Sequence, residues 1–197
     1  MNSDIRSALR PALVMLLLFS VLTGLAYPAV ITGIAQLVFP AQANGSLIRD
    51  GGKIVGSELI GQNFAAPKYF HGRPSAAGKN GYDGTSSSGS NLGPTSKALV
   101  DRVRADVKAA RAGGVTGDVP GDMLTTSASG LDPHISPASA RLQIARVAKA
   151  RGMTEPQVQA MVEGAVEAPL AGILGEPRVN VLMLNRQLDK IGAKPTG

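Results

Sequence analysis

The sequence has no cysteine or tryptophan and only two histidines among its 197 residues. An exported domain of this size without cysteine must be held together by packing, because no disulfide can form. Two imidazoles and no thiolate also do not indicate a dedicated zinc or iron–sulfur site. Aromatic residues are scarce, and none follows Tyr82. The net charge of +6 is spread along the chain without a stacking platform beside it, so we expect no nucleic-acid partner.

Charged residues are also missing from a long N-terminal stretch, since none occurs between Arg10 and Arg49. Most of residues 11–36 are apolar. A bilayer core of about 30 Å needs about 20 such residues in a helix. The sequence therefore predicts one transmembrane helix over residues 11–36, with Pro28 marking a kink or the end of the buried part.

A cleaved signal peptide is the alternative interpretation, because residues 41–43 read Ala-Gln-Ala. Signal h-regions are about 7–15 residues long, and this apolar stretch is nearly twice that. We therefore favour a retained signal-anchor. Arg6 and Arg10 precede the span and no basic residue follows it closely, so the positive-inside rule predicts a cytoplasmic segment over residues 1–10 and a periplasmic domain over residues 37–197.

The segment after the span predicts a single α+β domain, so the expected fold is one transmembrane helix followed by a mixed α/β extracytoplasmic domain. Asp50-Gly51-Gly52 between apolar runs over residues 44–48 and 53–60 is typical of a β-hairpin. Helical periodicity, alternating apolar runs and Gly/Ser-rich stretches give the remaining elements. The expected caps are Ser136, a capping box at Thr154–Gln157, and Asn185. The elements are helices over 97–112, 136–152, from 154 and 185–191, strands over 119–126 and 178–184, polar loops over 76–96 and 127–135, and a connector over 169–175.

Motifs for catalysis or ion conduction are weak. The chain has no GxxxxGK[ST] phosphate loop, no DKTG phosphorylation loop and no TVGYG filter. One span cannot enclose an ion pathway by itself. Ser129, Asp132 and His134 could be read as a nucleophilic triad, but their crowding around Pro133 in one loop favours a tight turn instead.

Several blocks of sequence together resemble the C subunit family (KdpC) of the Kdp potassium-transporting ATPase. They occur in the family's order and cover nearly the whole chain. One departure is Ser88, where the family commonly has glycine. The blocks are Tyr27-Pro28 and residues 44–48, 56–64, 69–75, 89–94, 127–135, 146–151 and 179–182.

This resemblance implies a non-catalytic accessory subunit of a high-affinity, ATP-driven potassium importer in the bacterial inner membrane. The implied partners are a potassium-translocating subunit, a P-type ATPase subunit and a small single-span subunit. The implied role is that of a catalytic chaperone, which raises the ATPase subunit's affinity for ATP. ATP-binding then belongs to the complex, and we expect no cofactor bound directly by this chain.

The two polar loops and the blocks beside them supply the candidate contact residues. We expect these residues to hold the domain's own fold or a partner subunit, and not the transported cation. Two alternatives stay open: a membrane-anchored periplasmic hydrolase using Ser129 and His134, and a nucleotide-binding module using residues 89–91 and Gln62. The candidate partner or loop contacts are Gln62, Arg73, Gly89, Ser90, Asn91, Ser129, Gly130, Asp132 and His134.

Overall fold

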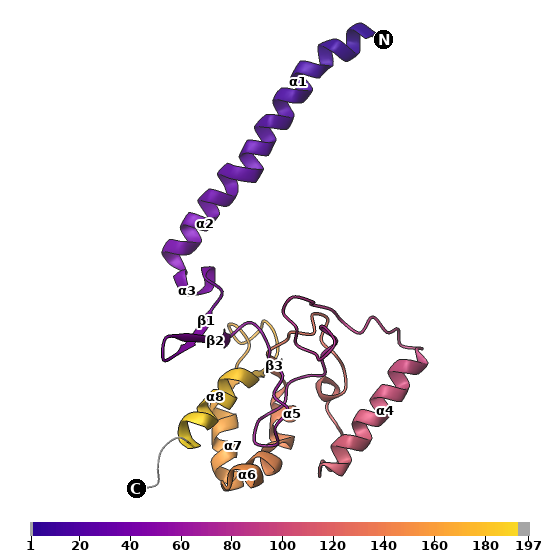
Figure 1. The fold of residues 1–197 in the computed structure, drawn as a ribbon, viewed down its shortest axis with the longest axis vertical. Helices are drawn as coiled ribbons and strands as arrows, with labels where there is room; N and C mark the ends of the chain where they lie inside the picture. Colours follow the sequence, from indigo (N-terminus) through magenta and orange to yellow (C-terminus); the bar gives the residue numbers. More distant parts are fainter. Residues whose placement is uncertain (1, 193–197) are drawn as a thin grey trace. The chain divides into compact units, whose positions relative to one another are not determined.

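A computed structural model describes residues 2–192 of the chain, which divides into two compact units, Met1–Ile54 and Val55–Gly197 (Figure 1). The expected α+β class is confirmed: one long apolar helix precedes a region of short helices and small sheets. Residues 193–197, the last of the predicted domain, lie outside the described residues.

The N-terminal helix consists of α1 (Asn2–Val21), the π-helical turn η1 (Leu22–Ala26) and α2 (Tyr27–Val38). The backbone stays right-handed helical at both junctions, so the helix continues through Pro28. Pro28 has no amide proton, and its ring would crowd the carbonyl four residues earlier. The turn before it is widened accordingly, with the Tyr27 amide donating to the Leu22 carbonyl.

From residue 5 to residue 38, every residue of this helix except the half-buried Ala35 is exposed. Its segment Ile5–Val38 spans 34 residues, is long and apolar enough to cross a membrane, and buries none of its most apolar window inside the protein. At about 1.5 Å per residue it measures about 51 Å, more than the hydrocarbon thickness alone. Lipid or another protein must therefore cover it.

The predicted β-hairpin follows the short helix α3 (Pro40–Ala43) and is confirmed as β1 (Leu47–Asp50) and β2 (Lys53–Ser57). Gly51 and Gly52 have φ of 53° and 83°, which a two-residue turn of this kind requires. The second strand was expected to reach Ile60, but it ends at Ser57. There the Ser57 hydroxyl accepts from the Leu59 amide at 3.1 Å, which turns the chain out of the sheet.

The helix predicted over 97–112 is confirmed as α4 (Lys97–Ala112), which stands apart from the other helices of its unit (Figure 1). None of its residues is fully buried. The strand predicted over 119–126 is wrong, because this segment contains a 3-10 turn, η2 (Gly121–Met123). Pro120 lacks a donor for a ladder, and Thr125 closes the turn by bonding the Gly121 carbonyl through its hydroxyl at 2.7 Å.

The helix predicted over 136–152 is two helices, α5 (Pro137–Leu142) and α6 (Ile144–Arg151), which break at Gln143. The side chain of Gln143 is buried and bonds the backbone of His71 instead of following the helix surface. The predicted capping box is confirmed at α7 (Glu155–Gly164), where Thr154 and Gln157 bond each other's backbone amides.

A three-stranded antiparallel sheet joins β3 (His134–Ile135), β5 (Arg178–Asn180) and β4 (Val166–Glu167), in that order. The strand predicted over 178–184 is too long, since α8 (Val181–Gly192) begins directly after Asn180. Asn185 does not cap this helix as expected. Asn180 does, because its side-chain oxygen accepts from the Met183 amide at 3.1 Å.

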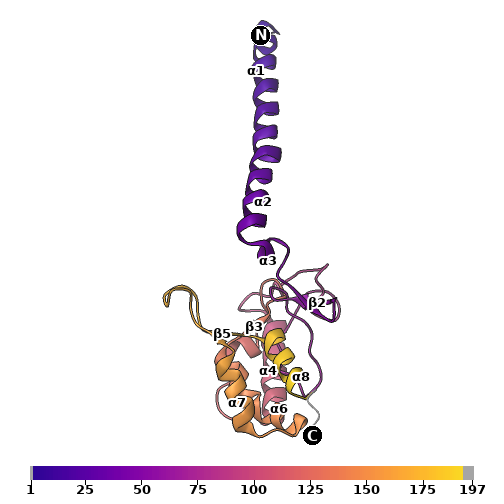
Figure 2. The ribbon, with the colours of Figure 1, turned by 90° about the vertical axis from the view of Figure 1, so that its left-hand side faces the viewer.

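The hydrophobic core belongs to the second unit and is built from α5–α8, the sheet and one loop residue, Phe70. Figure 2 shows the four helices gathered at one end of the unit. The buried residues of the core are Phe70, Ile135, Ala140, Ile144, Val147, Ala148, Val158, Val162, Val179, Val181, Leu184 and Leu188.

Candidate functional site

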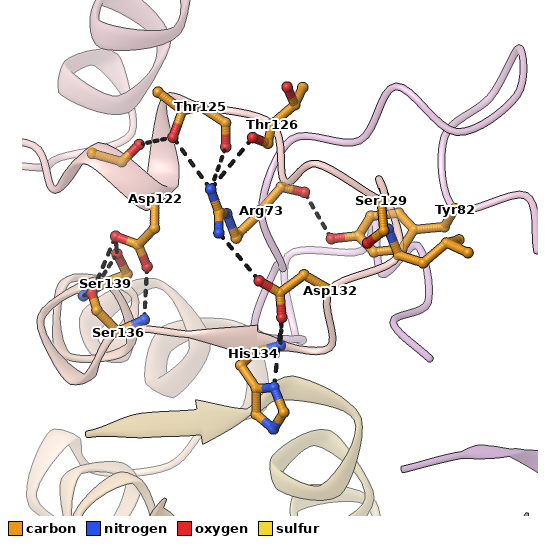
Figure 3. Close-up of polar contacts among 12 residues, drawn as sticks. Arg73, Tyr82, Asp122, Thr125, Thr126, Ser129, Asp132, His134, Ser136 and Ser139 are labelled. Atoms are coloured by element: carbon orange, nitrogen blue, oxygen red, sulfur yellow. Dashed lines mark hydrogen bonds and ion pairs between the residues drawn. The ribbon is translucent and has the colours of Figure 1, made fainter. Parts of the chain in front are cut away.

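Three of the candidate residues, Arg73, Asp132 and His134, meet at the start of β3 (Figure 3). Asp132 precedes Pro133, and its Oδ1 accepts from the His134 amide at 3.0 Å, which is an Asx-type turn. Its other oxygen, Oδ2, accepts from Arg73 Nη1 at 3.1 Å. The ring of His134 turns back to the same carboxylate, with Nδ1 3.5 Å from Oδ1. This turn places a carboxylate between His134, which belongs to the turn itself, and Arg73, which comes from a distant segment.

The carboxylate is held in its charged form. Burial by itself raises the pKa of Asp132, but the hydrogen bonds from His134 and Arg73 outweigh burial and leave this pKa below its ordinary value. The neighbouring phenol responds in the opposite sense: burial and the charge of Asp132 raise the pKa of Tyr82 to about 12. Tyr82 therefore stays neutral and donates its hydroxyl proton to the Arg73 carbonyl at 2.7 Å.

Arg73 ties three segments together. Besides Asp132, its Nη2 donates to the carbonyls of Thr125 and Thr126 and to the Thr125 hydroxyl, at 3.4–3.5 Å. The guanidinium has a planar fork of donors and suits several acceptors at once. Most hydrogen-bonding capacity of the Arg73 side chain is therefore used within the protein.

The two polar loops pack directly against each other. The Ser129 carbonyl accepts from the Ser88 amide at 3.0 Å and from the Ser87 hydroxyl at 2.9 Å. A Cβ on Gly89 would lie 2.9 Å from the Ala128 carbonyl oxygen, and one on Gly130 would lie 2.6 Å from that of Ser88. The small residues of these loops thus serve close backbone contact between the loops.

Ser129 and His134 are engaged separately. The Ser129 hydroxyl accepts from the Leu131 amide at 3.1 Å, whereas His134 faces Asp132 and lies 3.9 Å from Glu167 (Figure 3). Within residues 2–192 no contact joins this hydroxyl to the imidazole, so the described chain shows no assembled nucleophile–base pair. The described residues also hold no cluster of acidic or histidine side chains that could bind a metal ion.

The remaining candidates lie outside this network. Gln62 donates to the Val55 carbonyl at 2.8 Å and so fastens the loop to β2. Asn91 is exposed and has a φ of 52°, a conformation that asparagine tolerates better than most residues. Ser90 is partly exposed beside Gly89. None of the cavities described within residues 2–192 is lined by Gln62 together with residues 89–91.

Comparison with known proteins agrees with the resemblance in the sequence. Residues 9–190 match the family described as "KdpC: K+-transporting ATPase, c chain". The chain belongs to the KdpC family. A "Potassium-transporting ATPase KdpC subunit" of Caulobacter vibrioides is 60% identical over 184 residues, 93% of each chain. Proteins of the same name from Allorhizobium ampelinum and Bradyrhizobium diazoefficiens are 56% and 54% identical, covering 95% and 94% of this chain and 98% of each relative.

Two buried amides of this KdpC chain hold the loop beside the site, a structural role that the sequence did not predict. Gln143 pairs with both backbone groups of His71, at 2.8 and 3.1 Å. Asn185 does the same for Phe70, at 2.8 and 2.9 Å. A side-chain amide offers one acceptor and one donor, as a neighbouring strand would. For Gln143 the available signal was a polar residue on the apolar face of the helix predicted over 136–152. Asn185 gave no such signal, because the predicted helix began at that residue.

Asp122 is a third missed residue. Its carboxylate accepts from the Ser136 amide at 2.7 Å and from the hydroxyls of Ser136 and Ser139 at 3.1 and 2.6 Å. An acidic group at the first turn of α5 complements the unpaired amides and partial positive charge there. The expected cap by Ser136 is also present, accepting from the Ser139 amide at 3.1 Å.

A cavity of about 630 Å³ opens beside the network of this KdpC domain. Arg73, Asp122, Asp132 and His134 form its polar side. The segment between β4 and β5 also lines the cavity, mainly with apolar residues that include Leu170 and Leu174. The cavity is thus bounded by the candidate residues and by a loop that the sequence marked only as a connector.

Proposed function

We propose that this KdpC chain is a non-catalytic accessory subunit that stabilises the assembled potassium-transporting ATPase. The observation that carries the proposal is the use of the candidate residues within the chain itself. Arg73, Asp132 and the two polar loops bond each other, and Ser129 and His134 have separate partners. Such a network fixes the shape of a domain and leaves no prepared nucleophile.

The proposed partners are a potassium-translocating subunit, a P-type ATPase subunit and a small single-span subunit. The helix Ile5–Val38 supports such contacts, because its apolar surface has no cover within the described chain. Gly24 and Gly33 have no atom within 4 Å of a Cβ position, so a partner helix has room to approach closely.

The proposed orientation is an inner-membrane single span with a cytoplasmic N-terminus and a periplasmic domain. Arg6 and Arg10 precede the apolar segment, and Arg49 is the next charged residue. A reporter active only in the cytoplasm, fused after residue 197, should stay silent, whereas one active only in the periplasm should report. The reverse result would overturn this orientation.

The proposed effect on ATP affinity is indirect. With a periplasmic domain, only residues 1–10 would face the nucleotide, and no cavity described within residues 2–192 is lined by the direct-binding candidates, Gln62 and residues 89–91. We propose that binding of the chain raises the ATP affinity of the ATPase subunit through a two-state element in the membrane. Saturable ATP binding by the purified chain alone would contradict this.

The deciding experiment separates assembly from transport. Asp132→Ala removes the acceptor of Arg73 and should lower the yield of intact complex, while surviving complexes keep their potassium affinity. Asn91→Ala serves as the exposed-loop comparison, and Ser129→Ala should leave potassium-stimulated ATPase activity unchanged. A fully assembled Asp132→Ala complex with much weaker potassium affinity, or loss of activity in Ser129→Ala, would refute the proposal.

A further inference from the structure

The segment between β4 and β5 forms a small closed loop, here called the apolar loop (residues 169–175). The Leu170 amide donates to the Leu174 carbonyl at 2.9 Å, and the Leu174 amide donates back to Leu170 at 3.0 Å. At its base, Arg178 and Glu167 form an ion pair at 2.9 Å. Figure 2 shows this segment, next to β5, extending away from the helices of the unit. Its backbone is therefore closed by its own hydrogen bonds, and none of its residues belongs to the core.

The large side chains of this loop face solvent. Leu170, Ile173 and Leu174 are 73%, 83% and 61% exposed. Clustered apolar side chains on a hydrogen-bonded, projecting loop indicate an interaction site, because exposure to water does not stabilise them. Ala171 also adopts a left-handed conformation, with φ of 53°, and such local strain is concentrated at functional positions.

The charged side chains beside the loop indicate which kind of partner surface would complement it. Two cations line the cavity that the loop also lines, and each has a partner: Arg73 is paired with Asp132, and Arg178 is paired with Glu167. Asp122 and Glu176 also line it. Asp122 is already bonded by Ser136 and Ser139, whereas Glu176 has no ion pair within residues 2–192. The surface is thus an apolar projection next to one carboxylate, that of Glu176, which no cation of the described residues neutralises. It fits an apolar groove flanked by lysine or arginine.

A protein surface fits this pattern better than a lipid surface. Loops that insert into bilayers combine apolar tips with aromatic side chains and with Lys or Arg for anionic headgroups. Residues 168–177 contain no aromatic or basic residue, and Glu176 is their one charge. An anionic membrane would repel this edge of the domain.

We propose that the apolar loop docks into an apolar groove, flanked by basic side chains, on another subunit of the transporter. The inference rests on the proposed accessory role and adds the surface that makes the contact. Leu170, Ile173 and Leu174 are the anchors, and a basic side chain of the partner enters the cavity toward Glu176. An apolar centre with a polar rim is the usual anatomy of such interfaces.

Photocrosslinking in membranes tests directly which molecule contacts the apolar loop. A benzophenone amino acid replaces Ile173 in the full chain, co-expressed with the other subunits, and a second chain carries it at the exposed Lys97 of α4. We expect a covalent adduct with another subunit from position 173 and none from position 97. An adduct with lipid or with a second copy of the chain, equal adducts from both positions, or no adduct from 173 would overturn the proposal.

Substitution tests the anchors in the same complex. Leu170→Ser with Ile173→Ser should lower recovery of the complex at least about tenfold, which corresponds to about 1.4 kcal/mol. Ala171→Gly relieves the strained φ, keeps all three anchors and should assemble normally. Glu176→Gln should weaken assembly more at low salt than at high salt. Equal recovery of wild type and the double variant would overturn this inference alone, while a wild-type chain that never co-purifies would overturn the proposed function as well.

Discussion

At the scale of single residues, Asp132 shows how a turn residue becomes a structural centre. One oxygen closes the local turn with the His134 amide, and the other receives Arg73 from a segment 59 positions away in sequence. A charged acceptor strengthens both bonds. The charge of this carboxylate is therefore part of the fold's stability.

Asp132→Asn should destabilise the domain by about 1 kcal/mol near neutral pH, a modest value because solvent reaches the ion pair. The pKa of Asp132 lies below its ordinary value, so its contribution is present above that value and is lost as pH falls through the folded-state pKa. Urea unfolding of the detergent-solubilised chain should show a gap between wild type and variant at about pH 7 that narrows below about pH 4. A gap independent of pH would contradict this.

Gly130 illustrates a residue whose missing side chain is required. Its φ is 67°, and a Cβ would lie 2.6 Å from the Ser88 carbonyl oxygen and 2.7 Å from the Ala77 nitrogen. Gly130→Ala should therefore cost about 2–4 kcal/mol of unfolding free energy. Gly84→Ala is the matched control, because nothing lies within 4 Å of its Cβ position. Similar unfolding midpoints for the two variants would show that the loops do not pack as described.

At the scale of elements, the loop of residues 61–75 is attached to the helices by side chains instead of by a strand. Gln143 stands at the α5–α6 break and Asn185 lies within α8, and together they pair with consecutive residues of this loop, His71 and Phe70. The pairing places Phe70 in the core. It also explains why the helix predicted over 136–152 is interrupted.

Asn185→Ala should lower the unfolding free energy by about 2–4 kcal/mol, since it leaves a buried donor and a buried acceptor of Phe70 unpaired. Gln187→Ala, on the exposed face of the same helix, should change it by less than about 0.5 kcal/mol. Chemical denaturation of both variants provides the measurement. Equal stability of the two variants would contradict the role of Asn185 in attaching the loop to α8.

At the scale of the whole molecule, the core and the apolar N-terminal helix are separate in sequence. Every buried core residue lies at or after Phe70, and the apolar segment ends at Val38. Folding of the second unit therefore has its own apolar centre. The helix is left to meet lipid or partners.

A fragment of residues 37–197 should purify as a soluble protein that unfolds cooperatively, yet fail to assemble with the other subunits. Its core is complete, whereas the helix with Gly24 and Gly33 is missing. Co-purification after co-expression measures assembly, and circular dichroism measures folding. Normal recovery of the complex with this fragment would show that the helix is dispensable.

The sequence by itself determined those features that depend on near neighbours. The uncharged apolar run, the Asp-Gly-Gly turn, the cap at Ser136 and the capping box at Thr154 all follow from local chemistry, and the structure contains each of them. The family could also be identified from the sequence, because its blocks occur in order along the chain. Local geometry and the order of these blocks depend on adjacent residues, so the sequence is enough to predict them.

Tertiary structure alone decided the features that depend on partners far away in sequence. Gln143 breaks a helix because His71 needs its amide, and Phe70 is held in the core because Asn185 pairs with its backbone. Of the nine candidate contacts, Arg73, Asp132 and His134 converge, and Gln62 serves the hairpin instead. Propensity and periodicity do not encode such long-range hydrogen bonds, so only the folded chain shows which polar residues it uses for itself.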